Sequence, residues 1–248
     1  MTAQTEPAAP DGTGNDENLV LSYIAVRQAL GLLGLSLPLS LLAFGLWSPS
    51  DFASSISGFY YTPMGGVLTG ILTAIGVFLC AYRGYPRQPG EWLSDRWLAR
   101  LAGLAAIGVA LMPIGRAGYP VCVQDPAPVC WRFGFTFQPD LAHYAAAVLF
   151  FTCMALIALV QFPRGERDAD GRLCWTLNTW IYLSSGGLIV ASMAAVGLYF
   201  LTTGAARAAM DAARFLFWSE SVGILAFSAA WLVKGKALRM IAALRPGD

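Results

Sequence analysis

The chain has 248 residues, of which 56% are hydrophobic and only 12% are charged, and its formal net charge is +1. A soluble domain usually carries about 25% charged residues, so this composition excludes an ordinary water-soluble fold. The balanced charge also argues against nucleic acid as a partner, because no basic stripe runs through the sequence. We expect an all-α membrane protein whose partners are membrane lipids.

The N-terminal segment 1–18 is polar and carries four acidic residues but no Lys or Arg. A signal peptide begins with a basic region, so this segment is not one. Its Pro, Gly, Thr, Asn and Asp content is typical of disorder. We therefore predict a disordered tail over 1–18, a membrane domain over 19–236 and a basic cytoplasmic tail over 237–248.

Six apolar stretches approach the length of about 20 residues that crosses the hydrocarbon core of a bilayer. They lie at 27–47, 62–82, 97–114, 141–162, 178–201 and 215–234. The sequence therefore predicts a bundle of six transmembrane helices. At the start of the second helix, Thr62 is expected to be the N-cap and Pro63 the first helical residue.

Lysine and arginine divide unevenly between the two sides of the predicted bundle. Twelve of the 16 lie on the side that holds both termini, and four lie on the other: Arg116, Arg132, Arg207 and Arg214. The excess of positive charge marks the cytoplasmic side. Both termini are therefore expected in the cytoplasm, and the outward-facing loops are 48–61, 115–140 and 202–213.

Cys122 and Cys130 are a pair of cysteines within one predicted outer loop. An oxidising compartment permits a disulfide there, and the alternative is two free thiols. The remaining cysteines, Cys80, Cys153 and Cys174, fall in predicted helices or in a cytoplasmic loop. We expect them to stay reduced.

Two ionisable residues lie inside predicted spans, where each charge needs a reason. His143, the only histidine, is about one turn into the fourth helix, and Glu220 is about two turns into the sixth. Both are expected at similar depth on the outer side. One interpretation is that they connect helices, with Glu220 paired to His143, Arg116 or Arg214. The other is that they bind a ligand or carry a proton.

The second, fourth and sixth helices all present their N-termini outward, and Asp140 is placed to cap the fourth. Helix N-termini carry partial positive charge and favour anions such as a lipid phosphate or carboxylate. The loop 55–64 alternates hydroxyls and aromatics, and is either an interfacial loop or a polar lid. The candidate ligand-binding residues are His143, Glu220, Asp140, Tyr60, Tyr61, Arg116 and Arg214. With one histidine, neither a metal site nor a cofactor is expected.

Several segments together resemble a family of uncharacterised bacterial six-helix inner-membrane proteins. They are Ser-Ile-Ser-Gly-Phe-Tyr-Tyr-Thr-Pro-Met at 55–64, Gly-Val-Phe-Leu-Cys-Ala-Tyr-Arg-Gly-Tyr at 76–85, Phe-Trp-Ser-Glu-Ser at 217–221 and Trp-Leu-Val-Lys-Gly at 231–235. The resemblance spans most of the chain and implies a bacterial inner-membrane location, but no assigned activity. The architecture is also similar to the DRAM/Sfk group of eukaryotic six-helix proteins, which is associated with lipid distribution.

The absence of a hydrolase elbow, phosphate loop or zinc-protease motif favours a non-enzymatic role. The leading hypothesis is a non-catalytic protein that binds a lipid or small anion in an outward-facing polar pocket. The alternative is an intramembrane lipid-ester hydrolase with Thr62 or Ser57 as nucleophile, His143 as base and Glu220 orienting the imidazole. Fatty-acid-ester hydrolases of the androgen-induced-gene type, which use an intramembrane Thr and His, are similar in this respect. A proton-coupled transporter that uses Glu220 is the second alternative.

Overall fold

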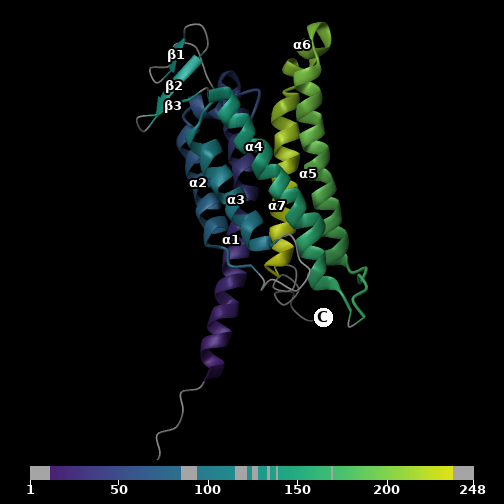
Figure 1. The fold of residues 1–248 in the computed structure, drawn as a ribbon. Helices are drawn as coiled ribbons and strands as arrows, with labels where there is room; N and C mark the ends of the chain where they lie inside the picture. The colour runs from purple at the N-terminus through teal and green to yellow at the C-terminus, as the bar shows by residue number, and fades with distance from the viewer. Residues whose placement is uncertain are drawn as a thin grey trace, which may run out of the picture.

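In the computed structural model, the chain forms a helical bundle with a small β-sheet beyond one end (Figure 1). The structure describes residues 12–84, 94–114, 122–124, 128–132, 135–137, 139–168 and 170–236. Within these, side chains are described for 23–84, 94–114, 141–168 and 170–236.

The helices follow the apolar stretches of the sequence closely. They are α1 (Gly12–Trp47), α2 (Gly65–Ala81), α3 (Asp95–Leu111), α4 (Pro139–Leu156), α5 (Leu177–Leu201), α6 (Gly204–Ala212) and α7 (Phe215–Lys234). α4 continues without a break into a π-helical turn at Ile157–Gln161 and a 3-10 turn at Phe162–Glu166. The loop between α1 and α2 contains 3-10 turns at Pro49–Asp51 and Ser57–Tyr61. The short helix α6 was not predicted.

Four helical segments within the described residues are long and apolar enough to cross a membrane. They are Tyr23–Trp47, Leu141–Glu166, Leu177–Leu201 and Phe215–Lys234. α2 is apolar as well, but shorter. The expectation of an integral membrane protein is therefore supported, whereas the crossing of α2 and α3 remains a prediction.

Each long helix packs against at least two others. α2 and α3 lie side by side, α3 contacts α4, and α7 packs between α1 and α5 (Figure 1). α2 and α3 approach closely because both have glycine at the crossing: a Cβ on Gly103 would lie 2.6 Å from the Gly76 carbonyl oxygen. By contrast, a Cβ on Gly66 or Gly70 would meet nothing within 4 Å, so these glycines make no helix contact.

The prediction that Thr62 caps α2 is wrong, because α2 begins at Gly65 and Met64 precedes it as the N-cap. Thr62 instead ends the 3-10 turn at Ser57–Tyr61. Its backbone N–H and its hydroxyl both donate to the Phe59 carbonyl, at 3.1 and 2.8 Å. The Thr62 hydroxyl also accepts from the Met64 N–H at 3.2 Å, so it bonds both the 3-10 turn and the residue that precedes α2.

Two further predictions concern segments that are partly described. α1 begins at Gly12, so helix covers part of the segment 1–18 for which disorder was predicted. Residues 1–11 and the predicted basic tail 237–248 lie outside the described residues.

The predicted outer loop, 115–140, contains three short antiparallel strands that were not predicted: β1 (Cys122–Gln124), β2 (Pro128–Arg132) and β3 (Phe135–Phe137). The β1–β2 register places Cys122 directly opposite Cys130. Opposed residues in an antiparallel pair have Cα atoms about 4.5–5.5 Å apart, which falls within the span of a disulfide. The side chains of this loop lie outside the described part, so the disulfide remains a prediction.

Candidate functional site

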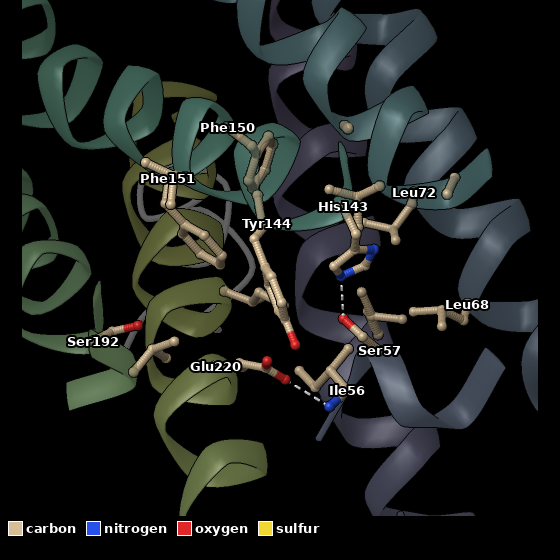
Figure 2. Close-up of a pocket in the computed structure, with 18 of the residues that line it drawn as sticks. Ile56, Ser57, Leu68, Leu72, His143, Tyr144, Phe150, Phe151, Ser192 and Glu220 are labelled. Carbon is tan, nitrogen blue, oxygen red and sulfur yellow. Dashed lines mark hydrogen bonds between the residues drawn. The ribbon is translucent and has the colours of Figure 1, made fainter. Parts of the chain in front are cut away.

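A pocket of about 360 Å³ lies among the helices near the end of the bundle that carries the α1–α2 loop (Figure 2). Its walls are almost entirely apolar, and several helices contribute lining residues at helical spacing. The α4 stripe is His143, Ala147 and Phe151, and the α7 stripe is Glu220, Ile224 and Phe227. The polar lining groups include Ser57, Tyr60, His143, Tyr144 and Glu220, which come from the loop and from the first turns of α4 and α7.

The pocket reaches the surface of the bundle between α4 and α5. Its lining residues there are partly exposed, with relative accessibilities of 36% for Tyr144 and 57% for Val148 on α4, and 43% for Phe200 on α5. The ring centroids of Tyr144 and Phe200 lie 5.1 Å apart, so these two side chains form a contact between α4 and α5. Both helices belong to segments able to cross a membrane, so this opening faces the region that lipid would occupy.

At the polar end, Ser57 and His143 form a hydrogen-bonded pair. The Ser57 Oγ lies 2.8 Å from His143 Nε2, and His143 Nδ1 lies 2.7 Å from the Met112 carbonyl oxygen (Figure 2). A carbonyl oxygen only accepts, so Nδ1 carries the proton and donates it to Met112. Nε2 of the neutral ring is then an acceptor, and the Ser57 hydroxyl donates to it. His143 is only 3% exposed.

The Met112 carbonyl is available because α3 ends at Leu111, and Pro113 follows at once. The last carbonyls of a helix have no partner within it, so they must be satisfied from outside. His143 fills this role for Met112 and links the end of α3 to the start of α4. The Met112-Pro113 pair is the signal in the sequence for this carbonyl, because Pro113 has no backbone N–H with which to continue the helix.

Glu220 holds the loop in place. Its carboxylate accepts a hydrogen bond from the Ile56 backbone N–H at 2.6 Å (Figure 2). A second bond, from the Phe217 N–H to the Ser54 carbonyl at 2.9 Å, ties the same loop to the first turn of α7. Because Ser57 and Met112 occupy both ring nitrogens of His143, Glu220 acts on the residue beside Ser57 and not on the imidazole.

The other hydroxyl candidates divide between the pocket and its supporting loop. Tyr60 lines the pocket beside Ser57. Thr62 does not, because its hydroxyl is directed at the Phe59 carbonyl. Tyr61 donates its hydroxyl proton to the Ile114 carbonyl and braces the loop against the end of α3. The site therefore brings together His143, Ser57, Glu220 and Tyr60, and leaves Thr62 and Tyr61 outside.

The charged candidates are not gathered in the same way. The Arg214 guanidinium lies over the Phe52 ring, 4.3 Å from its centroid, and Arg214 is not among the residues that line the pocket. Arg116 and the side chain of Asp140 lie outside the described residues. α4 begins at Pro139, which places Asp140 within the first helical turn instead of at the N-cap.

Sequence reasoning missed Tyr144 and Ser192, both of which line the pocket. Tyr144 points toward the polar end in Figure 2. The signal was present in α4, where Tyr144 and Val148 repeat the four-residue spacing of His143 and Ala147, but that spacing is equally typical of a packed helix.

A second group of buried polar side chains lies at the opposite end of the bundle. Lys234 is 7% exposed and donates to the Phe162 carbonyl at 3.1 Å. Asp95, 6% exposed, accepts from the Tyr82 hydroxyl at 3.5 Å, and Tyr82 accepts from Arg27 at 3.3 Å. These bonds connect α7 to the 3-10 turn that follows α4, and connect α1 and α3 to Tyr82 at the end of α2, so they tie helices together.

Within the described residues, no group of three or more His, Cys, Asp or Glu side chains is arranged to hold a metal ion. No family model, curated protein or solved structure matches this chain. What the pocket does must therefore be argued from its own geometry.

Proposed function

We propose that this protein binds an acyl chain of a membrane lipid in the pocket, with the polar part of the lipid at the end formed by Ser57, His143 and Glu220. The observation that carries the proposal is the division of the pocket into apolar walls and one polar end. A lipid has the same division, and the opening between α4 and α5 provides a route from the bilayer. Most small-molecule sites likewise combine an apolar lining with a few placed polar groups.

The lining favours a lipid over the small anion that was considered as an alternative. Among the described residues that line the pocket, Glu220 is acidic and none is Lys or Arg. An anion removed from water needs a cation or several donors to offset the loss of its hydration. An acyl chain needs only apolar contact. The volume of about 360 Å³ lies at the small end of ligand pockets and suits one chain better than a whole two-chain lipid.

The proposal includes the arrangement in the membrane. We place six helices across the inner membrane of a bacterium, with α1–α5 and α7 as the spans and both termini in the cytoplasm. The support is the excess of Lys and Arg on the side of the termini and the resemblance of four segments to bacterial inner-membrane proteins, at 55–64, 76–85, 217–221 and 231–235. The pocket and its polar end then lie toward the outer leaflet.

Native mass spectrometry of the protein purified in mild detergent tests lipid binding. Ala147 lines the pocket, so Ala147→Trp places a large ring inside it. Ala194 is exposed on α5 and is not among the lining residues, so Ala194→Trp is the matched control. We expect a lipid adduct on the wild type and on Ala194→Trp, and its loss from Ala147→Trp. Equal occupancy in both variants would contradict the assignment of the pocket.

A further inference from the structure

We infer that Ser57 is a nucleophile that takes the acyl group from an ester-linked lipid held in the pocket, with His143 as its general base. This inference rests on the proposed binding of a lipid. It goes beyond binding because it assigns a reaction class, acyl transfer, to the polar end. It also selects between the two hydroxyls considered from the sequence, since Ser57 contacts His143 and Thr62 contacts a backbone carbonyl.

The tautomer of His143 is the one that general-base catalysis needs. The Met112 carbonyl holds the proton on Nδ1, which leaves the lone pair of Nε2 directed at the Ser57 hydroxyl. The distance of 2.8 Å lies within the range over which a base removes a proton from a serine. In Ser-His-Asp enzymes a carboxylate fixes the tautomer, and here a helix-end carbonyl does so.

The position of Ser57 is held from outside the pair. Glu220 binds the N–H of Ile56, the residue before Ser57, and the backbone bond from Phe217 to Ser54 adds a second attachment. Glu220 is therefore a positioning residue. A nucleophile held in one place requires less ordering when the substrate reacts.

The depth of the pair suits the ester group of a lipid. Ser57 lies in the loop between α1 and α2, and His143 lies in the first turns of α4, so both are at the ends of the helices and not at mid-span. Ester groups join acyl chains to headgroups at the boundary of the hydrocarbon core, which matches this depth. With the chain lying along the apolar wall, the ester carbonyl reaches the polar end, where Tyr60 and Tyr144 add hydroxyl groups.

The reaction balances with water as the only co-reactant. Ser57 Oγ bonds to the ester carbonyl carbon while its proton passes to His143 Nε2. The carbon–oxygen bond to the lipid alcohol then breaks, and the alcohol leaves with the proton from Nε2. Water attacks the acyl-serine and gives a proton to Nε2. Ser57 recovers that proton as the fatty acid departs, so no oxidant or reductant is needed.

Labelling with a long-chain alkyl fluorophosphonate tests this inference, because the probe reacts with an activated serine by loss of fluoride. The full-length protein in detergent is labelled, digested and mapped by mass spectrometry. We expect the adduct on Ser57, none on Ser57→Ala, and a labelling rate about 10²- to 10⁴-fold lower in His143→Gln. Ser184, an exposed serine on α5 that bonds only within its own helix, provides the control Ser184→Ala, which should label like the wild type.

Two outcomes separate this inference from the proposed lipid binding. If the wild type retains lipid in native mass spectrometry but no adduct forms on Ser57, the acyl-transfer inference is wrong and binding stands. If Ala147→Trp leaves lipid occupancy unchanged, the pocket assignment fails, whatever the labelling shows. An adduct on Ser57 that persists at the same rate in His143→Gln would also overturn the inference, because the base would then be dispensable.

Discussion

The contact between Ser57 and His143 predicts a specific coupling energy in a double-mutant cycle. Ser57→Ala removes the hydroxyl that donates to Nε2. His143→Phe keeps a ring of similar shape but removes both this bond and the bond to the Met112 carbonyl. Only the first of these bonds is shared by the two substitutions, so the cycle isolates it.

The magnitude follows from the number of bonds each substitution breaks. Hydrogen bonds between helices in a membrane contribute about 0.6 kcal/mol on average and at most about 1.7 kcal/mol. We therefore expect Ser57→Ala to lower the free energy of unfolding by about 0.6–1.7 kcal/mol, and His143→Phe by about 1.2–3.4 kcal/mol. The double variant should be less destabilised than the sum of the two, by a coupling of about 0.6–1.7 kcal/mol.

The assay is reversible unfolding in mixed micelles, with sodium dodecyl sulfate as denaturant and far-ultraviolet circular dichroism as the signal. The wild type, both single variants and the double variant complete the cycle. Ser184→Ala combined with His143→Phe is the control, because Ser184 is exposed on α5 and the two effects should add within about 0.3–0.5 kcal/mol. A Ser57–His143 coupling no larger than this control would refute the hydrogen-bonded pair.

Three further predictions concern the surroundings of the pair. Peptide mapping without reduction should find Cys122 linked to Cys130, as their opposed register allows, and two alkylated thiols would contradict it. Glu220→Ala should slow fluorophosphonate labelling of Ser57 about 10- to 100-fold. Glu220→Gln should retain most of the labelling rate, because its amide oxygen still accepts a hydrogen bond. Equal labelling rates in the two variants would contradict a positioning role for Glu220. Gly103→Leu should lower the free energy of unfolding by about 1–3 kcal/mol or more, because the side chain would overpack the crossing of α2 and α3. Gly70→Leu should change it by less than about 0.5 kcal/mol. Unfolding in mixed micelles measures both, and equal effects would contradict this helix crossing.

The helices were largely predictable because the signal for a membrane helix is local. A long apolar stretch identifies the helix without knowledge of its neighbours, and each of the six predicted stretches corresponds to a helix. The sequence did not predict α6, because Gly204–Ala212 is short and lies between two predicted spans. There Arg207 bonds to the Tyr199 carbonyl at 2.6 Å and helps to hold the short helix against the end of α5.

The candidate site was predictable as a set of residue types, but not as a set of contacts. His143 and Glu220 were identified because a polar group within a span requires a reason. Their partners depend on the path of the α1–α2 loop, which no periodicity encodes. A 3-10 turn directs Thr62 back to Phe59 and presents Ser57 to the histidine. The bonds to the Met112 carbonyl and from the Ile56 N–H involve the backbone, which the sequence does not display.

The central claim is that a lipid chain occupies the pocket, and photochemical crosslinking tests it most directly. The protein is reconstituted in vesicles with a phospholipid that carries a diazirine on its acyl chain, irradiated and mapped by mass spectrometry. We predict crosslinks to Phe151, Met193 and Ile224, which line the pocket on α4, α5 and α7, and their loss in Ala147→Trp. Crosslinks confined to exposed outer positions such as Leu188 and Leu201, with the same pattern in Ala147→Trp, would contradict the account.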